Sequence, residues 1–369
     1  MNYTAITPEF QEVNFKEYES LGSTTSYASI LYKKTKYKLL EEVKRVFVNS
    51  GEKMRVLNCM KLMNGAEVQV KHNGERAYYS GIVSCGSVWT CPVCSSKITE
   101  ARREELSLAL SSSGLIPVMV TVTLQHERND KLAILLEALN DSLRKLKSGR
   151  WWKSFRSKYK VIAHVSSLEF TFSKHHGWHP HKHWLLFLDC KESEIDEQAI
   201  QKELTKQYKK HLEKHGRYAS EFYGIDVRVG DKQAGAYVSK WGMSEEMTKS
   251  NIKVGANESY SPFQLVELAS NGEKFAELAF LEYTRATFGK RQLVYSRGGR
   301  EALGIGEEKT DAELVEVEEK EDEIIISLSR EVWNVILRNT LQAEILYLAE
   351  SGGAPAVKEF INGLRHYET

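Results

Sequence analysis

The 369-residue chain has few of the features that would place it in a membrane or outside the cell. No run of apolar residues approaches the length needed to cross a bilayer, and the N-terminus lacks a charged start followed by an apolar core. Cysteines number only five, and three of them lie close together, which fits a metal site in a reducing compartment better than a disulfide framework. These absences predict a cytoplasmic protein.

A large excess of charge of either sign is also missing. Lysine plus arginine number 51 and aspartate plus glutamate number 50, which leaves a net charge of +1. The distribution is uneven, because residues 307–323 hold ten acidic and two basic side chains, a net of −8, and leave +9 for the remainder. The body of the chain is therefore basic, and the acidic stretch is predicted to be a separate solvated helix or linker. An apolar content of 41% is ordinary for a globular protein.

Three histidines stand at alternate positions in one stretch. His179, His181 and His183 share one face of a predicted strand, and Trp184, Leu186 and Leu188 face a core on the other side. A hairpin with the preceding strand could place Glu169 beside this row. Imidazoles with one carboxylate favour a divalent cation with open positions, manganese or magnesium, with zinc or nickel as alternatives in vitro. A surface cluster or core histidines are the competing interpretation for any single residue.

The cysteines predict a second metal site. Cys91 and Cys94 form a Cys-x-x-Cys turn, and Cys85 lies six residues before it. The fourth ligand is Cys59, His72 or a more distant histidine, and Cys59 is favoured because sulfur-rich sites are closed and structural. Structural zinc is favoured over thioredoxin-like redox chemistry, in which no third cysteine lies nearby.

Hydrophobic periodicity predicts an α+β fold. Strands are predicted at 116–124, 161–172, 181–188 and 223–229, and helices at 37–48, 96–110, 129–147 and 192–215. From the first of these strands onward the order is β-α-β-β-α-β, which predicts a ferredoxin-like antiparallel sheet with helices on one face.

Two regions combine positive charge with aromatic or phosphate-binding character. Trp151, Lys153 and Arg156 suit a single nucleic-acid strand, with charges on phosphates and rings on bases, although tryptophans that close a core are an equal alternative. A later ridge could contact phosphates, with a solvated face as the alternative. Its residues are Lys290, Arg291, Arg297 and Arg300.

A tyrosine and a lysine follow the fourth predicted strand. Tyr237 and Lys240 are three residues apart, so they share a face of a short predicted helix. A tyrosine hydroxyl is a poor nucleophile until its proton is withdrawn, and a metal-polarised phosphate beside a lysine supplies the required electrostatics. The spacing alone is unspecific, because the chain holds 17 tyrosines.

Two of these motifs resemble one family. The run from His179 to His183, with the apolar strand after it, resembles the His-hydrophobe-His motif of the HUH endonucleases, specifically the rolling-circle replication initiators of staphylococcal and Streptomyces plasmids. The segment from Cys85 to Cys94 resembles another part of the same family. Lys182 occupies the middle position of the motif, which is usually hydrophobic in this family. Because of this departure, two alternatives stay open: the metal pair is His181 with His183, or it includes His179. The resemblance covers roughly residues 59 to 306.

The resemblance implies roles for single residues. Tyr237 attacks a DNA phosphodiester, which leaves a free 3′ hydroxyl and a 5′-phosphotyrosine link, while Lys240 steadies the phosphate. Thr121 and Thr123 lie on a central strand near the DNA, although a plain core strand explains them equally. Gln233 stands where some relatives carry an acidic residue that ends the cycle. Candidates to replace it are Asp231, Glu169 and Tyr223.

The sequence thus predicts a metal-dependent single-strand DNA nickase and ligase that starts rolling-circle replication. Its expected partners are single-stranded or hairpin origin DNA and, from the family, a host helicase and DNA polymerase. Alternatives are a relaxase or single-strand transposase, a zinc-dependent DNA-binding regulator, and a metal-dependent hydrolase. The predicted domains are an N-terminal arm (1–54), a zinc-binding segment (55–110), a nuclease domain (111–245), an accessory DNA-contacting region (246–306), an acidic linker (307–323) and a C-terminal helical element (324–369).

Overall fold

The structure is a computed structural model that describes residues 26–62, 67–74, 76–230, 259–316 and 322–365. The chain divides into two compact units, one built from residues 1–38, 67–79 and 322–369 and the other from residues 39–66 and 80–321. Helix α2 (Ser26–Ser50) continues across the boundary between their sequences. Among the described helices, none combines the length and the apolar character that crossing a membrane requires.

The smaller unit contains a three-stranded sheet in the order β2-β1-β9. Its strands are β1 (Val68–His72), β2 (Ala77–Ser80) and β9 (Glu323–Leu328), and its later helices are α12 (Arg330–Arg338) and α13 (Gln342–Arg365). Tyr79 packs edge-on against Trp333, with ring centroids 4.8 Å apart, and its hydroxyl donates to the carbonyl of Gln342 at 2.8 Å. Residues from both ends of the chain therefore share one core.

Strand β9 corrects one prediction. The sequence analysis placed residues 324–369 in a helical element, and this is wrong for residues 324–328, which pair antiparallel with β1. Ile324, Ile325 and Ile326 are β-branched and favour extended backbone, and β1 offers them an edge to pair with. Helices follow from Arg330 onward, as predicted.

The described part of the larger unit contains a six-stranded sheet in which every pairing is antiparallel. Along its main path the strands are β6 (Ile225–Val229), β3 (Ile116–Val122), β5 (Gly177–Leu188), β4 (Val161–Ser173) and β7 (Ser259–Tyr260), and β8 (Leu293–Tyr295) also pairs with β4. The connecting helices are α4 (Leu132–Leu146), α5 (Arg150–Lys158) and α6 (Glu197–Leu212). The predicted succession of four strands and two helices is present, and α5 is an addition to it.

The remaining elements of this unit surround the sheet. Its other helices are α3 (Pro92–Ser112), α8 (Pro262–Ser270), α9 (Lys274–Thr287), α10 (Gly299–Ala302) and α11 (Asp311–Val315), and its short 3-10 helices are η1 (Arg55–Asn58), η2 (Glu192–Glu194) and η3 (Glu213–His215).

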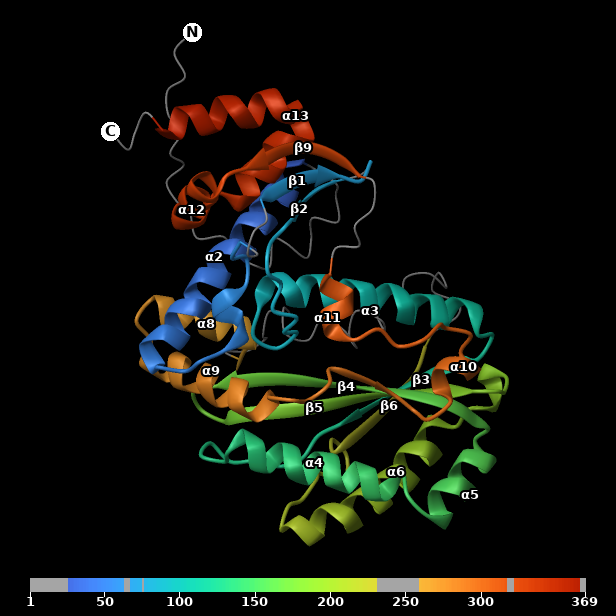
Figure 1. The fold of residues 1–369 in the computed structure, drawn as a ribbon. Helices are drawn as coiled ribbons and strands as arrows, with labels where there is room; N and C mark the ends of the chain where they lie inside the picture. Colours follow the sequence, from blue (N-terminus) through green and yellow to red (C-terminus); the bar gives the residue numbers. More distant parts are fainter. Residues whose placement is uncertain (1–25, 63–66, 75, 231–258, 317–321, 366–369) are drawn as a thin grey trace. The chain divides into compact units, whose positions relative to one another are not determined.

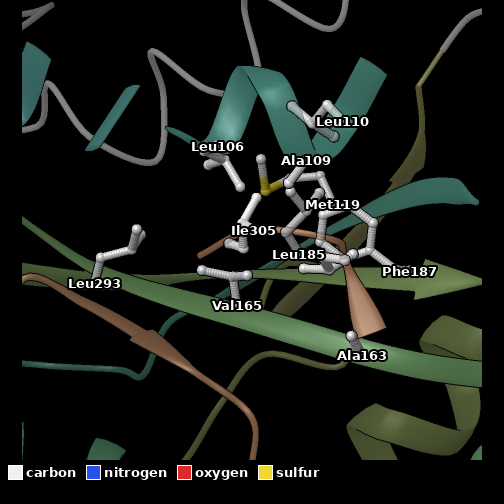
Figure 2. Packing of buried hydrophobic residues seen from close by; sticks show 11 residues of the cluster. Leu106, Ala109, Leu110, Met119, Ala163, Val165, Leu185, Phe187, Leu293 and Ile305 are labelled. Carbon is white, nitrogen blue, oxygen red and sulfur yellow. The ribbon is translucent and has the colours of Figure 1, made fainter. Parts of the chain in front are cut away.

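Two helical layers enclose the sheet. Helices α4 and α6 cover one face, and α3 lies over the other (Figure 1). The leucines of α4 form one stripe from Leu132 to Leu146 that is buried, and each fully buried leucine contributes roughly 1.5–3 kcal/mol. On the opposite face, Leu106 and Leu110 of α3 pack with Leu185 and Phe187 of β5 (Figure 2).

The face under α3 changes character along β5. Leu185 and Phe187 lie within the apolar cluster, and residues at earlier odd positions of the same strand face the same side because strand side chains alternate. Those earlier residues are His179, His181 and His183. One strand therefore supplies part of the core with its second half and a polar surface with its first half.

The acidic stretch is not simply a solvated linker. Asp311 and Glu308 lie 2.7 and 3.8 Å from the buried guanidinium of Arg102 on α3, and Val315 is buried. The segment docks on α3 because a buried arginine requires a carboxylate partner. The stretch predicted to be a solvated helix or linker thus holds a short helix, α11, and contacts α3 through Asp311 and Glu308.

Candidate functional site

The histidine row and Glu169 come together at the centre of the larger sheet. Glu169 on β4 stands directly opposite His181 on β5, and its Oε2 lies 2.5 Å from Nε2 of His183. One ligand atom from each of these three residues lies within 4.8 Å of the others, which is close enough for a single metal ion to bind all three. The predicted position of Glu169 beside the histidines is confirmed.

Strand β3 and the residue that follows it, Thr123, support two of the histidines from the other side. The hydroxyl of Thr121 lies 3.2 Å from Nδ1 of His183, and the hydroxyl of Thr123 lies 2.9 Å from Nε2 of His179. Hydrogen bonds of this kind fix the orientation of a metal-binding imidazole. The two threonines, predicted to lie near DNA, therefore contact the histidines themselves.

His179 has a different environment from the other two histidines. It does not belong to the group that could share one ion, and its ring centroid is 4.2 Å from that of His181 and 4.7 Å from that of His126. Burial and these two neighbours lower the pKa of His179 to about 3, so its ring is neutral at physiological pH. Of the two alternatives for the metal pair, this geometry favours His181 with His183.

Lys182 points to the opposite face of the sheet. Its ammonium donates to Oδ1 of Asn140 on α4 at 2.7 Å, and burial, with Lys147 and Lys290 nearby, lowers its pKa to about 7. The middle position of the histidine motif therefore faces the layer of α4. Here a lysine occupies that place, and Asn140 supplies its acceptor.

A cavity of about 1040 Å³ adjoins the Glu169 and histidine cluster. Its wall combines Glu169, His179 and His181 with polar residues of the β4-β5 turn and with the turn before β6. Thr123 also lines it, so the support for His179 faces the same space. The cluster is thus accessible to a substrate much larger than an ion.

The four predicted zinc ligands form a second cluster. Cys59, Cys85, Cys91 and Cys94 are buried, and their sulfur atoms all lie within 4.8 Å of one another. Three of the separations are 3.5, 3.7 and 3.7 Å, whereas sulfurs on a tetrahedron around zinc are about 3.8 Å apart for a bond of about 2.3 Å. The donor set and spacing fit a tetrahedral metal ion, and Cys59 occupies the fourth position.

The local backbone explains why these thiols converge. Cys91 caps α3, with its sulfur accepting from the backbone N–H of Cys94 at 3.3 Å, and Pro92 starts the helix. Hydrogen bonds from Cys59, Cys85 and Cys91 lower the pKa of Cys94, whereas burial raises that of Cys91. A bound metal requires all four groups as thiolates, so binding releases protons.

The predicted DNA-contacting residues have mixed environments. Trp151 is half-buried and packs on Phe155, with ring centroids 5.1 Å apart, and Arg156 donates to the carbonyls of Val161 and Ile162. This tryptophan therefore packs partly on Phe155 and keeps part of its ring exposed. Lys153 is exposed.

The second predicted ridge is also only partly available. Arg291 lies 3.2 Å from Glu308, and Arg300 pairs with Glu105 at 2.8 Å. Lys290 and Arg297 are exposed. Acidic side chains of the same unit thus neutralise two of the four cations.

The predicted nucleophile and its neighbours lie outside the described residues. These are Tyr237, Lys240, Gln233 and Asp231. Strand β6 ends at Val229, so the described chain stops just before the segment that holds them. Their roles remain predictions.

Residues at the cavity that were not predicted include His126 and Tyr218, whereas Tyr223 was named only as a substitute for Gln233. His126 follows β3, and its Nδ1 lies 3.0 Å from the carbonyl of His176. Tyr218 and Tyr223 line the cavity from the turn before β6. The run Tyr218-Ala-Ser-Glu-Phe-Tyr223 offered a signal, because three aromatics in a short polar loop are unusual for a segment outside the core.

Comparison with known proteins bears on both motifs. A family model described as "Replication protein" matches residues 83–336, more than half of the chain. The chain is 22% identical over 345 aligned positions to the protein named "Protein rep" of Streptomyces lividans, with 73% of this chain and 76% of that protein covered. It is also 27% identical over 135 positions to the "Neomycin resistance protein" of Streptomyces cyanogenus, with 29% and 31% covered.

No solved structure matches the chain. The family match contains both the histidine row and three of the four clustered cysteines, and the relative that aligns over most of its length carries the name "Protein rep". The chain therefore belongs to the replication protein family of plasmid replication initiators.

Proposed function

We propose that this protein nicks single-stranded DNA at a replication origin through Tyr237 and so starts rolling-circle replication of the replicon that encodes it. The observation that supports this most is the convergence of Glu169, His181 and His183 on neighbouring central strands, beside a cavity of about 1040 Å³. Membership of the replication protein family supplies the biological setting.

The fold that we propose for the nuclease domain, residues 111–245, is the ferredoxin-like sheet of the HUH endonucleases. The spatial order β6-β3-β5-β4 supports it, because a β-α-β-β-α-β chain of this type brings its first and third strands together in the centre. Helices α4 and α6 lie on one face, as such a chain requires (Figure 1). The site is then on the opposite face, away from both connecting helices.

Glu169, His181 and His183 would hold manganese or magnesium, which when bound polarises the phosphate to be cut. Thr121 orients His183, and Thr123 holds the neutral ring of His179 beside them. The hydroxyl oxygen of Tyr237 loses its proton and bonds to phosphorus. The bond from phosphorus to the 3′ oxygen breaks, and that oxygen gains a proton to become a free 3′ hydroxyl.

The reverse reaction closes the strand. A 3′ hydroxyl attacks the phosphotyrosine, a new phosphodiester forms, and Tyr237 regains its proton. Lys240 balances the charge of the phosphate in both directions. The free 3′ hydroxyl would prime a host polymerase, with a host helicase opening the duplex.

We assign zinc to the four cysteines as a structural metal. The cluster joins Cys59 to the first turn of α3, and α3 covers half of the face that carries the site. Three of the predicted phosphate contacts are exposed and so accessible to DNA. These are Lys153, Lys290 and Arg297.

A gel assay tests the nucleophile. Single-stranded oligonucleotides tiled across the replicon are incubated with manganese and the wild-type protein, Tyr237→Phe, or Tyr347→Phe as a matched control from the smaller unit. We expect a protein–DNA adduct that resists denaturant with wild type and Tyr347→Phe, and none with Tyr237→Phe or after chelation.

Other results would redirect the proposal. Equal cutting by Tyr237→Phe, with no adduct, would replace tyrosine attack with metal-dependent hydrolysis. Binding without cutting by any protein would favour a zinc-dependent regulator.

A further inference from the structure

The turn between η3 and β6 exposes an unusual set of side chains. Tyr218, Phe222 and Tyr223 are 61%, 77% and 81% exposed. Among the residues whose exposure the structure describes, only Phe288 is a comparably exposed aromatic residue outside this turn. Burying an aromatic ring is strongly favourable in free energy because the ring has a large apolar surface. Three exposed rings within six residues therefore indicate a surface that binds a ligand.

The turn is held in a defined conformation. The hydroxyl of Ser220 accepts hydrogen bonds from the backbone N–H groups of Phe222 and Tyr223, both at 3.2 Å. A Cβ on Gly224 would lie 2.5 Å from the carbonyl oxygen of Ser220, so this position excludes larger residues. The rings therefore project from a turn whose backbone is fixed before any ligand arrives.

Two further contacts fasten the turn to the site. The backbone N–H of Thr123 donates to the carbonyl of Gly224 at 3.0 Å, and that of Gln125 donates to Tyr218 at 2.8 Å. Arg217 forms two hydrogen bonds to Asp130, at 2.6 and 2.7 Å. The segment that holds His179 through Thr123 thus also carries the aromatic turn.

Two of the three rings lie beside the cluster of Glu169 and the histidines, and Phe222 stands next to them in the turn. Tyr218 and Tyr223 line the same cavity as Glu169, His179 and His181. The cavity is larger than one phosphate group needs, so a strand whose phosphate lies at the cluster has room for adjoining nucleotides along this wall.

Aromatic rings on a fixed wall suit unpaired bases. Every base has a flat face, so stacking on tyrosine or phenylalanine binds a single strand with little preference for sequence. Stacking requires bases that are free of a duplex, which distinguishes single-stranded from double-stranded DNA. An aromatic wall beside a phosphate-binding metal cluster therefore matches one ligand, a nucleic-acid strand that passes from one to the other.

We propose that Tyr218, Phe222 and Tyr223 form a base-stacking subsite that grips the unpaired strand next to the nick site. This inference rests on the proposed nicking function, and it adds that strand selection is made by this turn. The side chains position the substrate and take no part in bond breaking.

Equilibrium binding tests the subsite apart from the chemistry. Fluorescent oligothymidine is titrated in the Tyr237→Phe background, so that no strand is cut. We compare this protein with variants that also carry Tyr218→Leu and Tyr223→Leu, or Tyr218→Phe and Tyr223→Phe as the matched controls that keep both rings. We expect the leucine variant to bind about 10- to 100-fold more weakly and the phenylalanine variant to bind normally.

Two additional readouts isolate stacking from structural damage. An oligonucleotide that carries 2-aminopurine should be quenched by the parent and the phenylalanine variant but not by the leucine variant. Abasic sites at the quenched positions should weaken the parent to the level of the leucine variant and leave the latter unchanged. Bound zinc and circular dichroism verify that each variant is folded.

The outcomes separate the two proposals. If wild type forms the tyrosyl adduct but the leucine variant binds and is quenched like its parent, the stacking subsite is wrong while the nicking function stands, and the turn is better explained as a protein-docking surface. Equal losses in the leucine and phenylalanine variants would also overturn the subsite, because the hydroxyls would then carry the effect. Failure of the wild-type protein to bind any single strand counts against the nicking function itself.

Discussion

The hydroxyl of Thr121 lies 3.2 Å from Nδ1 of His183, across the neighbouring central strands β3 and β5. The other ring nitrogen, Nε2, lies 2.5 Å from Glu169 on β4. Three adjacent strands thus fix one imidazole from both sides. This strand packing, and not the histidine row alone, determines how the ring is presented to a metal ion.

Replacing Thr121 with valine should weaken metal binding without unfolding the protein. Valine keeps the β-branched shape but removes the hydroxyl that orients His183, and such losses cost about 10-fold or more in metal affinity. Titration calorimetry with manganese measures the change. Thr205→Val is the control, because the buried Thr205 hydroxyl on α6 makes no hydrogen bond within the described residues. Equal manganese affinity in Thr121→Val and wild type would show that Thr121 does not position the ligand.

Glu169→Gln should abolish tight manganese binding and, with it, nicking. The amide has nearly the shape of the carboxylate but lacks its charge, and hard divalent cations prefer charged oxygen ligands. Glu137→Gln on the exposed face of α4 serves as the charge-matched control. Manganese titration and the adduct assay are run in parallel, and retention of both by Glu169→Gln would remove this residue from the site.

Cys91→Ser should release zinc and lower the melting temperature. The serine oxygen is a poor zinc ligand, and loss of one thiolate opens a closed site that ties Cys59 to the start of α3. Cys190→Ser is the matched control, because Cys190 lies outside the cluster. Metal content by mass spectrometry and thermal unfolding provide the measurements. A Cys91→Ser protein with one full equivalent of zinc would contradict the assignment.

Gly177→Ala should destabilise the β4-β5 hairpin more than other glycine substitutions do. Gly177 has φ of +72°, and an added Cβ would lie 2.4 Å from the carbonyl oxygen of Arg128. Gly216 has a similar φ of +63° with no atom within 4 Å of a new Cβ, so Gly216→Ala carries the backbone strain alone. Urea unfolding should show a larger loss for Gly177→Ala, by at least about 1 kcal/mol. Equal losses would mean that the backbone near Arg128 moves freely.

His164 gives the protein a defined sensitivity to acid. Burial against Trp152 and Trp184, with Lys147 and Arg156 nearby, lowers its pKa to about 3 from 6.5. Below a pH of about 6.5, His164 therefore binds a proton in the unfolded chain but stays neutral in the folded chain. The free energy of unfolding falls as the pH drops through this range. His164→Leu removes the group that binds this proton. As the pH falls from about 7.5 to about 5.5, we therefore expect its free energy of unfolding to rise relative to that of wild type by about 1.4 kcal/mol.

Urea unfolding at the two pH values measures this difference for His164. Carboxylates that titrate in both proteins cancel when the variant is compared with wild type. A difference in unfolding free energy that stays constant across the two pH values would show that the ring of His164 accepts a proton in the folded state.

Local patterns predicted the parts of the site that depend on alternation and spacing. Period-two histidines placed His181 and His183 on one face, and the same alternation placed Glu169 beside them. The Cys-x-x-Cys turn with Cys85 gave three ligands of the second cluster, and the preference for closed sulfur sites gave Cys59. The histidine row and the Cys-x-x-Cys turn need only the geometry of one strand or one turn, whereas Glu169 and Cys59 came from a predicted hairpin and from the chemistry of sulfur sites.

The features that sequence analysis missed depend on contacts between distant residues. The acidic stretch carried no sign that Asp311 would meet Arg102, and the isoleucines of β9 gave no sign of pairing with β1. Trp151 carried the same basic and aromatic pattern whether it met DNA or Phe155. Long-range partners decide such cases, and periodicity within a short window holds no information about them.

The smaller unit has a consequence for how such proteins can exchange parts. Its sheet joins β1 and β2, from residues 67–79, to β9, from the stretch after residue 322. A single crossover between the β1 and β9 coding regions of two related genes would give a protein with β1 from one parent and β9 from the other. A recombinant keeps a matched sheet only when β1, β2 and β9 all come from the same parent. We therefore expect this unit to be inherited as one block in evolution, although its sequence is interrupted.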